Sequence, residues 1–165
     1  NLHYTPSGQE EFDQPEMALW FHKTPPAKAL FTLPLVHQTF EIPPGAREHS
    51  ILARPPALLN PLPVSITLYA MAPHMHLRGA SMTFHIEYPN GQREVLLSVP
   101  KYNFNWQTRY QLAEPKVIPA GSRVWLTGSF DNSTLNLFNP DPSEPVRWGE
   151  QSWEEMFIGY FDVTL

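Results

Sequence analysis

The sequence predicts an all-β fold, an antiparallel β-sandwich of jelly-roll type with nine or ten short strands. Three observations lead to this prediction. Of the 165 residues, 19 are proline, and they recur as far as Pro145. Proline lacks the N–H donor that a helix interior needs, so this spacing excludes long helices. Apolar and polar residues alternate over short runs between turn signals, as in half-buried strands, and a 42% hydrophobic content supplies one core.

The expected strands cover residues 29–32, 35–42, 64–72, 82–88, 94–99, 110–112, 116–118, 123–130 and 156–163. Between two of these runs stands Asn90-Gly91, a strong hairpin signal. Gly45 and Gly121 each follow a proline-containing pair and predict two further turns. Residues 131–155 form a long polar loop, and loops of this length in compact domains are usually functional or disordered.

The domain organisation has two parts in our interpretation. Residues 1–28 mix polar and apolar stretches without regular strand signals, and we interpret them as the end of a preceding unit plus a linker. Residues 29–165 form the predicted sandwich domain. Because the sequence starts at Asn1 rather than at a methionine, we expect it to be a piece of a larger protein.

Composition and charge exclude several function classes. The net charge is −5 and the acidic residues are scattered, so no basic stripe is present to bind nucleic acid. No apolar run has the length needed to span a bilayer. The chain contains no cysteine, which excludes disulfides, thiolate metal sites and cysteine nucleophiles.

The strongest chemical signal is the pair His74 and His76. Residues i and i+2 of a strand point to the same face, so the two imidazoles are placed to converge on one ion. Neutral imidazole is the commonest metal ligand and suits copper, zinc, iron or nickel. Two histidines that merely face solvent give the same pattern. Four further histidines have no second histidine at ligand spacing, and we interpret them as surface or core residues: His22, His37, His49 and His85.

A third ligand would discriminate between these metals. Without cysteine, the candidates are another histidine, a carboxylate or a methionine. Met156 opens the last expected strand directly after Glu154 and Glu155. Thioether sulfur is soft and favours Cu(I), whereas the alternative role for a methionine here is to fill the core.

Three segments resemble landmarks of the copper type II, ascorbate-dependent monooxygenases, the family of the peptidylglycine α-hydroxylating and dopamine β-monooxygenases. Residues 72–79 resemble the family's His-x-His strand. Glu155-Met156 followed by Tyr160 resembles its acidic-Met segment, and residues 40–45 resemble its Ile-Pro-Pro-Gly turn. The landmarks occur in family order, and the chain is similar to the C-terminal copper domain of a bacterial-type member.

The resemblance implies one copper ion per chain, bound by His74, His76 and Met156, with Tyr160 lining the substrate pocket. It further implies activation of O₂ for C–H hydroxylation of a small-molecule or peptide-like substrate, with an ascorbate-like reductant. An upstream N-terminal copper domain is implied in the full-length protein, and His3 would be a remnant ligand of that second copper site. The family also implies an extracytoplasmic location, periplasmic or secreted.

Two departures limit what the resemblance carries. Ala72 stands where the peptide-amidating branch has an arginine, and Ile158 stands where that branch has an asparagine, so the peptide substrate class does not transfer. Without a second copper site, residues 1–165 alone are expected to turn over weakly or not at all. The alternatives are a copper-binding or electron-transfer module without catalysis, and a carbohydrate-binding or structural sandwich without metal.

Overall fold

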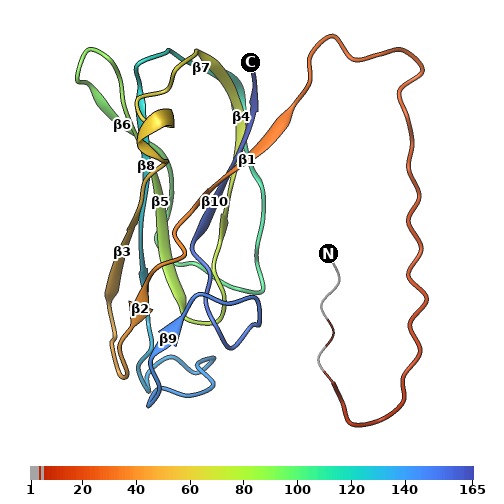
Figure 1. Ribbon diagram of the computed structural model, residues 1–165, viewed down its shortest axis with the longest axis vertical. Helices are drawn as coiled ribbons and strands as arrows, with labels where there is room; N and C mark the ends of the chain where they lie inside the picture. Colours follow the sequence, from red (N-terminus) through yellow and green to blue (C-terminus); the bar gives the residue numbers. More distant parts are fainter. Residues whose placement is uncertain (1–3, 5) are drawn as a thin grey trace.

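The computed structural model describes residue 4 and residues 6–165, and it confirms an antiparallel all-β sandwich (Figure 1). Within these residues the chain forms ten strands and one short 3₁₀ turn. The strands are β1 (Phe31–Val36), β2 (Glu41–Ile42), β3 (His49–Ala53), β4 (Ile66–His74), β5 (Gly79–Glu87), β6 (Arg93–Val99), β7 (Tyr110–Ile118), β8 (Arg123–Phe130), β9 (Val146–Arg147) and β10 (Ile158–Thr164), and the 3₁₀ turn η1 is Ala57–Leu59.

The eight long strands form two four-stranded sheets. One sheet has the order β1-β10-β4-β7 and the other has the order β3-β8-β5-β6, with all neighbours antiparallel. The chain crosses from one sheet to the other at every connection between the long strands except that between β5 and β6. This arrangement of eight strands in two layers is that of a jelly roll. The short strands β2 and β9 pair with each other beside the layers.

The core lies between the two sheets and follows the period of the strands. Along β5, Met82, Phe84 and Ile86 are fully buried, whereas the residues between them are partly exposed. Phe130 and Phe157 complete an aromatic centre, with their ring centroids 6.1 Å apart. Full burial of one such side chain contributes about 1.5–3 kcal/mol.

A bulge in β4 decides which of its residues face outward. In the pairing with β10, Leu68 and Ala70 lie opposite the consecutive residues Val163 and Asp162, so Tyr69 is the extra residue. The buried positions of β4 therefore change from Leu68 and Ala70 to Met71 and Pro73. Ala72 and His74 therefore lie on the outer face of the β1-β10-β4-β7 sheet.

The local predictions stand as follows. The hairpin at Asn90-Gly91 is confirmed, because β5 and β6 pair around it and Gly91 has a φ of +83°. The sequence interpretation missed β3, whose five residues end one residue before the Pro55-Pro56 pair. The expected break at Pro115 was wrong: β7 continues through it, which an edge strand tolerates because its outer N–H needs no partner. The long loop also contains β9.

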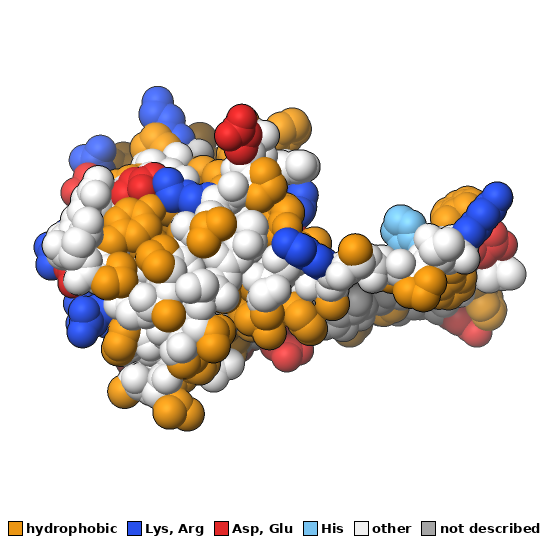
Figure 2. Space-filling view, turned by 90° about the horizontal axis from the view of Figure 1, so that it is seen from above, with side chains coloured by type: hydrophobic (Ala, Val, Ile, Leu, Met, Phe, Trp, Pro, Cys, Tyr) orange, Lys and Arg blue, Asp and Glu red, His pale blue; other side chains and the backbone are white. Residues whose placement is uncertain are grey.

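Residues 6–30 carry no helix or strand and extend away from the sandwich (Figure 1). Large apolar side chains of this arm are strongly exposed, and Figure 2 shows hydrophobic atoms along it: Phe12, Met17, Leu19, Trp20 and Phe21. In the described part of the chain there is no helix with the length and hydropathy required to traverse a bilayer.

Candidate metal centre

The His-x-His pair lies where β4 ends on the outer face of its sheet. His74 is the last residue of β4, and His76 follows it in the loop toward β5. The two ring centroids are 5.2 Å apart with the planes nearly perpendicular. His74 is half-buried, whereas His76 is only 5% exposed. The structure therefore brings together the two imidazoles that the sequence predicted to converge.

The tautomer of His74 follows from its hydrogen-bond partner. The Nδ1 of His74 lies 2.6 Å from the Oε1 of Gln107. The amide nitrogen of Gln107 donates to the carbonyl of Phe104 at 3.0 Å, which orients its oxygen toward His74. Because that oxygen only accepts, Nδ1 of His74 carries the proton and Nε2 bears the free lone pair.

His76 is held in the same tautomer by a different partner. Its Nδ1 lies 3.2 Å from the backbone carbonyl of Glu154, which accepts only. The edge of His76 also faces the ring of Phe104, with 6.0 Å between centroids. Nε2 of His76 is therefore the nitrogen with a lone pair to offer, as in His74.

Both imidazoles are biased toward the neutral form that binds metals. Burial lowers the pKa of His74, and the hydrogen bond with Gln107 raises it only in part. Burial also lowers the pKa of His76, against the backbone hydrogen bonds that favour its charged form. A neutral imidazole with a fixed tautomer and a buried ring is the state that a metal ligand requires.

Tyr160 lies on β10, the strand next to the histidines, whereas Met156 precedes that strand by two residues and does not open it as the sequence predicted. β10 pairs with β4 so that Ile158, two residues after Met156, lies opposite His74. Tyr160 lies opposite Ala72, and its ring centroid is 6.5 Å from that of His74. Met156 is partly exposed, unlike the core methionines Met71, Met75 and Met82.

The hydroxyl of Tyr102 fixes the backbone between the two histidines. It donates to the carbonyl of Met75 at 2.7 Å and accepts from the Met75 N–H at 3.0 Å. Burial raises the pKa of Tyr102 to about 12, so the hydroxyl keeps its proton. Gly79 permits this close packing, because a Cβ there would lie 2.6 Å from the Cβ of Met75 and 2.8 Å from the Tyr102 ring.

The buried carboxyl group of Glu155 joins the histidine loop to the segment that contains Met156. Glu155 has no exposed surface. Its Oε2 accepts from the His76 N–H at 2.8 Å, and its Oε1 accepts from the Arg78 N–H at 2.5 Å. Burial raises the pKa of Glu155 to about 8, against these N–H bonds and the nearby Arg78 charge. The Glu155 side chain thus fixes the position of His76 relative to Met156, the residue that follows Glu155.

The remaining histidines stay apart. His85 lies on the other sheet, where it hydrogen-bonds to Thr127 and stacks on Trp125. Across residues 4 and 6–165, no three histidine, cysteine, aspartate or glutamate side chains come close enough to hold a metal together. His3 lies outside the described residues.

Three of the residues that shape this centre were not predicted from the sequence. Gln107, Tyr102 and the role of Glu155 depend on contacts across 33, 27 and 79 positions respectively. No local pattern marks the first two. Glu155 was noticed only as one of an acidic pair, and burial of that carboxylate is what gives it a function.

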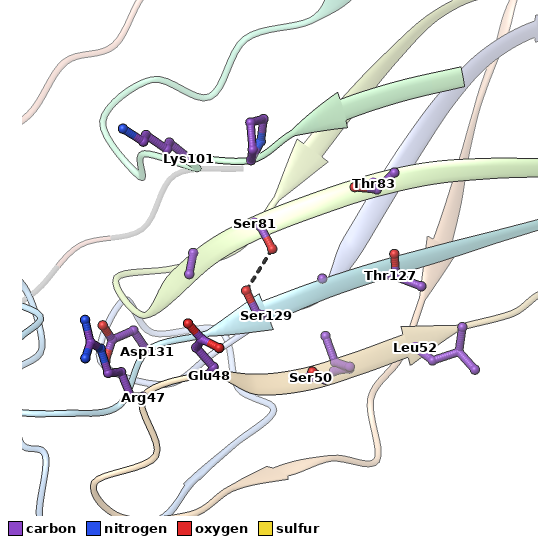
Figure 3. Close-up of a pocket in the computed structure, with 14 residues that line it drawn as sticks. Arg47, Glu48, Ser50, Leu52, Ser81, Thr83, Lys101, Thr127, Ser129 and Asp131 are labelled. Atoms are coloured by element: carbon purple, nitrogen blue, oxygen red, sulfur yellow. Dashed lines mark hydrogen bonds between the residues drawn. The ribbon is translucent and has the colours of Figure 1, made fainter. Parts of the chain in front are cut away.

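A hollow of about 1080 Å³ lies away from the histidines, on the outer face of the β3-β8-β5-β6 sheet (Figure 3). Hydroxyl side chains line its floor, and the Oγ atoms of Ser81 and Ser129 lie 2.7 Å apart in mutual hydrogen bonding. Nearby Trp125 is stacked on His85 at 5.1 Å, with Arg93 on its ring at 6.0 Å. Glu48 and Asp131 line the hollow, but its lining contains no histidine and no aromatic residue on which a sugar could stack.

Comparison with known proteins adds no relative. No protein-family model matches the sequence, and no curated protein gives a significant match.

Proposed function

We propose that this chain binds one copper ion through His74, His76 and Met156 and serves as the oxygen-activating site of a monooxygenase. The observation that carries the proposal is the pair of fixed tautomers. Gln107 and the Glu154 carbonyl each engage an Nδ1, which leaves two Nε2 lone pairs on neighbouring rings.

The donor set fits copper better than harder ions. Two imidazoles and one thioether make a soft, neutral site, and soft sulfur favours Cu(I). Zinc and iron sites more often include a carboxylate or thiolate, and the described residues offer neither within reach of the two histidines as a third ligand. Copper bound here would supply the redox chemistry by which O₂, two electrons and two protons convert a substrate C–H into C–OH and water.

The residues of the chain have separate tasks in this proposal. Gln107 and Glu155 orient the ligands, and Tyr102 fixes the peptide between them. Tyr160 lies beside His74 and lines a hollow on the outer face of the sheet, where a substrate can approach. An ascorbate-like reductant would supply the electrons, and an upstream copper domain would deliver the second electron in a longer protein. These features, with O₂ chemistry, also favour an extracytoplasmic location.

Cu(I) affinity combined with O₂ uptake tests the proposal. Chelator competition should show one tight Cu(I) per chain, weakened at least about 100-fold in His74→Ala. His85→Ala is the matched control and should bind copper as the wild type does, because His85 lies on the other sheet. Ascorbate should then drive slow but measurable O₂ uptake in the wild type and the control only, because residues 1–165 carry a single copper site in this proposal.

The runner-up function, a copper-binding or electron-transfer module, makes the same binding prediction. It differs in predicting no ascorbate-driven O₂ uptake by the copper-loaded protein. Absence of tight Cu(I) binding in the wild type would contradict both functions.

A further inference from the structure

A hollow of about 330 Å³ lies on the same outer face as His74, beside the candidate metal centre. Ala72, two residues before His74 on β4, forms part of its floor, so the hollow begins about 6.6 Å along the strand from that ligand. Tyr160 stands between the two, with its ring centroid 6.5 Å from that of His74. A molecule bound in the hollow would therefore reach the metal centre past the tyrosine ring.

Arg109 is fixed at the rim of this hollow by a buried carboxylate. The register of β4 with β7, continued by one residue, brings Arg109 opposite Ala72. Its Nε donates to the Oδ2 of Asp162, whose other oxygen accepts from Thr32 at 2.6 Å. Asp162 is 8% exposed, and Gln111 accepts a further N–H from Arg109 at 3.5 Å. The guanidinium is thus oriented from behind and retains unused N–H donors.

Arg109 and Asp162 together carry no net charge. Burial acts to raise the pKa of Asp162, but the hydrogen bonds from Thr32 and Arg109 outweigh it and keep the pKa below its ordinary value. The carboxyl is therefore ionised and balances Arg109. A ligand carboxylate would compete with Asp162 for the same cation, and a ligand ammonium would face a guanidinium. An uncharged oxygen acceptor meets neither penalty.

From this balance we propose that the hollow binds an uncharged molecule that combines a carbonyl oxygen with a small aromatic or alkyl group. The carbonyl accepts from Arg109, and the apolar group lies on Ala72 against the ring of Tyr160. The inference rests on the proposed function only in calling this molecule a substrate. Binding itself requires no copper.

Benzamide, benzoate and benzylamine test the proposal because they share one ring and differ in charge. Each is titrated into the copper-free chain and followed by NMR of the ¹⁵N-labelled protein. Benzamide should bind about tenfold more tightly than either charged analogue and should shift the signals of Ala72, Tyr160 and the Arg109 Nε–H.

Two substitutions separate the effect of the Arg109 charge from the effect of the volume of the hollow. Arg109→Met should remove the preference for the amide, whereas Arg123→Met should keep it, because Arg123 is a similarly exposed arginine paired with Glu87 on the other sheet. Ala72→Leu fills the hollow without touching the ion pair and should abolish binding. This variant gives an answer even if loss of Arg109 unfolds the chain.

Tighter binding of benzoate or benzylamine would overturn the proposal, as would the absence of benzamide binding or shifts confined to residues remote from Ala72. Because copper is absent throughout, these results are independent of whether the chain binds Cu(I). Loss of benzamide binding with intact Cu(I) binding would contradict only the ligand proposal for the hollow. Intact benzamide binding without Cu(I) binding would contradict only the proposed function.

Discussion

The outer faces of the two sheets differ in how their polar side chains are used. On the β3-β8-β5-β6 sheet, Ser81 and Ser129 hydrogen-bond to each other and His85 to Thr127, so the polar groups satisfy one another across neighbouring strands. On the β1-β10-β4-β7 sheet, His74 and Arg109 are held from one side and keep donor or acceptor atoms free on the other.

The difference shows that the buried, fully paired polar contacts are concentrated in the loops around His76. The loops around His76 contain a buried carboxylate and a buried tyrosine hydroxyl that bond to backbone N–H groups rather than to each other. Buried polar groups of this kind stabilise only when fully paired, and they then fix one arrangement. The hydroxyls of the opposite face can change with little consequence.

The largest effect is expected from Gly79→Ala. The added methyl group would overlap Met75 and the Tyr102 ring, so the peptide between the histidines must move. We expect a loss of about 3 kcal/mol in the free energy of unfolding, the upper range for overpacking, together with weakened Cu(I) binding. Urea unfolding and chelator competition measure the two effects.

Ala113→Val is the control for this prediction, because it adds volume at an exposed position of β7. It should leave both quantities unchanged. A Gly79→Ala protein of wild-type stability would show that the packing at Tyr102 does not constrain the histidine loop.

A smaller effect is expected from Glu155→Gln. The amide keeps the size of the side chain, but one of its ends donates, so it cannot accept from both the His76 and Arg78 N–H groups. One buried N–H is then unsatisfied, at a cost of about 2 kcal/mol. Cu(I) affinity should fall with it, because His76 is no longer held toward Met156.

Chemical unfolding and Cu(I) competition again give the answer, with the exposed Glu150→Gln as the control. If Glu155→Gln loses stability and keeps its copper affinity, then Glu155 supports the fold and does not position the ligand.

The smallest effect is expected on the opposite face. Ser129→Ala removes one partly exposed hydrogen bond to Ser81 and should cost about 0.5 kcal/mol, with no change in Cu(I) affinity. A large loss of copper binding in this variant, measured by the same competition, would remove the distinction between the two faces.

The sequence predicted what depends on neighbouring residues. Asn90-Gly91 specifies a hairpin locally. The His-x-His spacing predicted two neighbouring imidazoles, although only His74 is on β4 and His76 lies in the loop after it. Strand β3 was missed because five residues before a Pro-Pro pair carry little periodic signal. The sandwich class followed from proline spacing and alternation, which sample the whole chain.

The contacts that shape the centre were beyond the reach of the sequence. Gln107 and Arg109 reach His74 and Ala72 only through the register of β4 with β7, which a bulge shifts. Glu155 reaches His76 across 79 positions. Such pairings depend on the topology of the sheets, and no spacing in the sequence encodes them.

X-ray absorption of the Cu(I)-loaded wild type, beside Met156→Ile and His76→Ala, tests the central claim most directly. The account predicts two nitrogen ligands and one sulfur ligand in the wild type, with the sulfur lost only in Met156→Ile and one nitrogen lost in His76→Ala. A sulfur signal that persists in Met156→Ile, or a wild-type site without sulfur, would contradict the assignment of Met156 as a ligand.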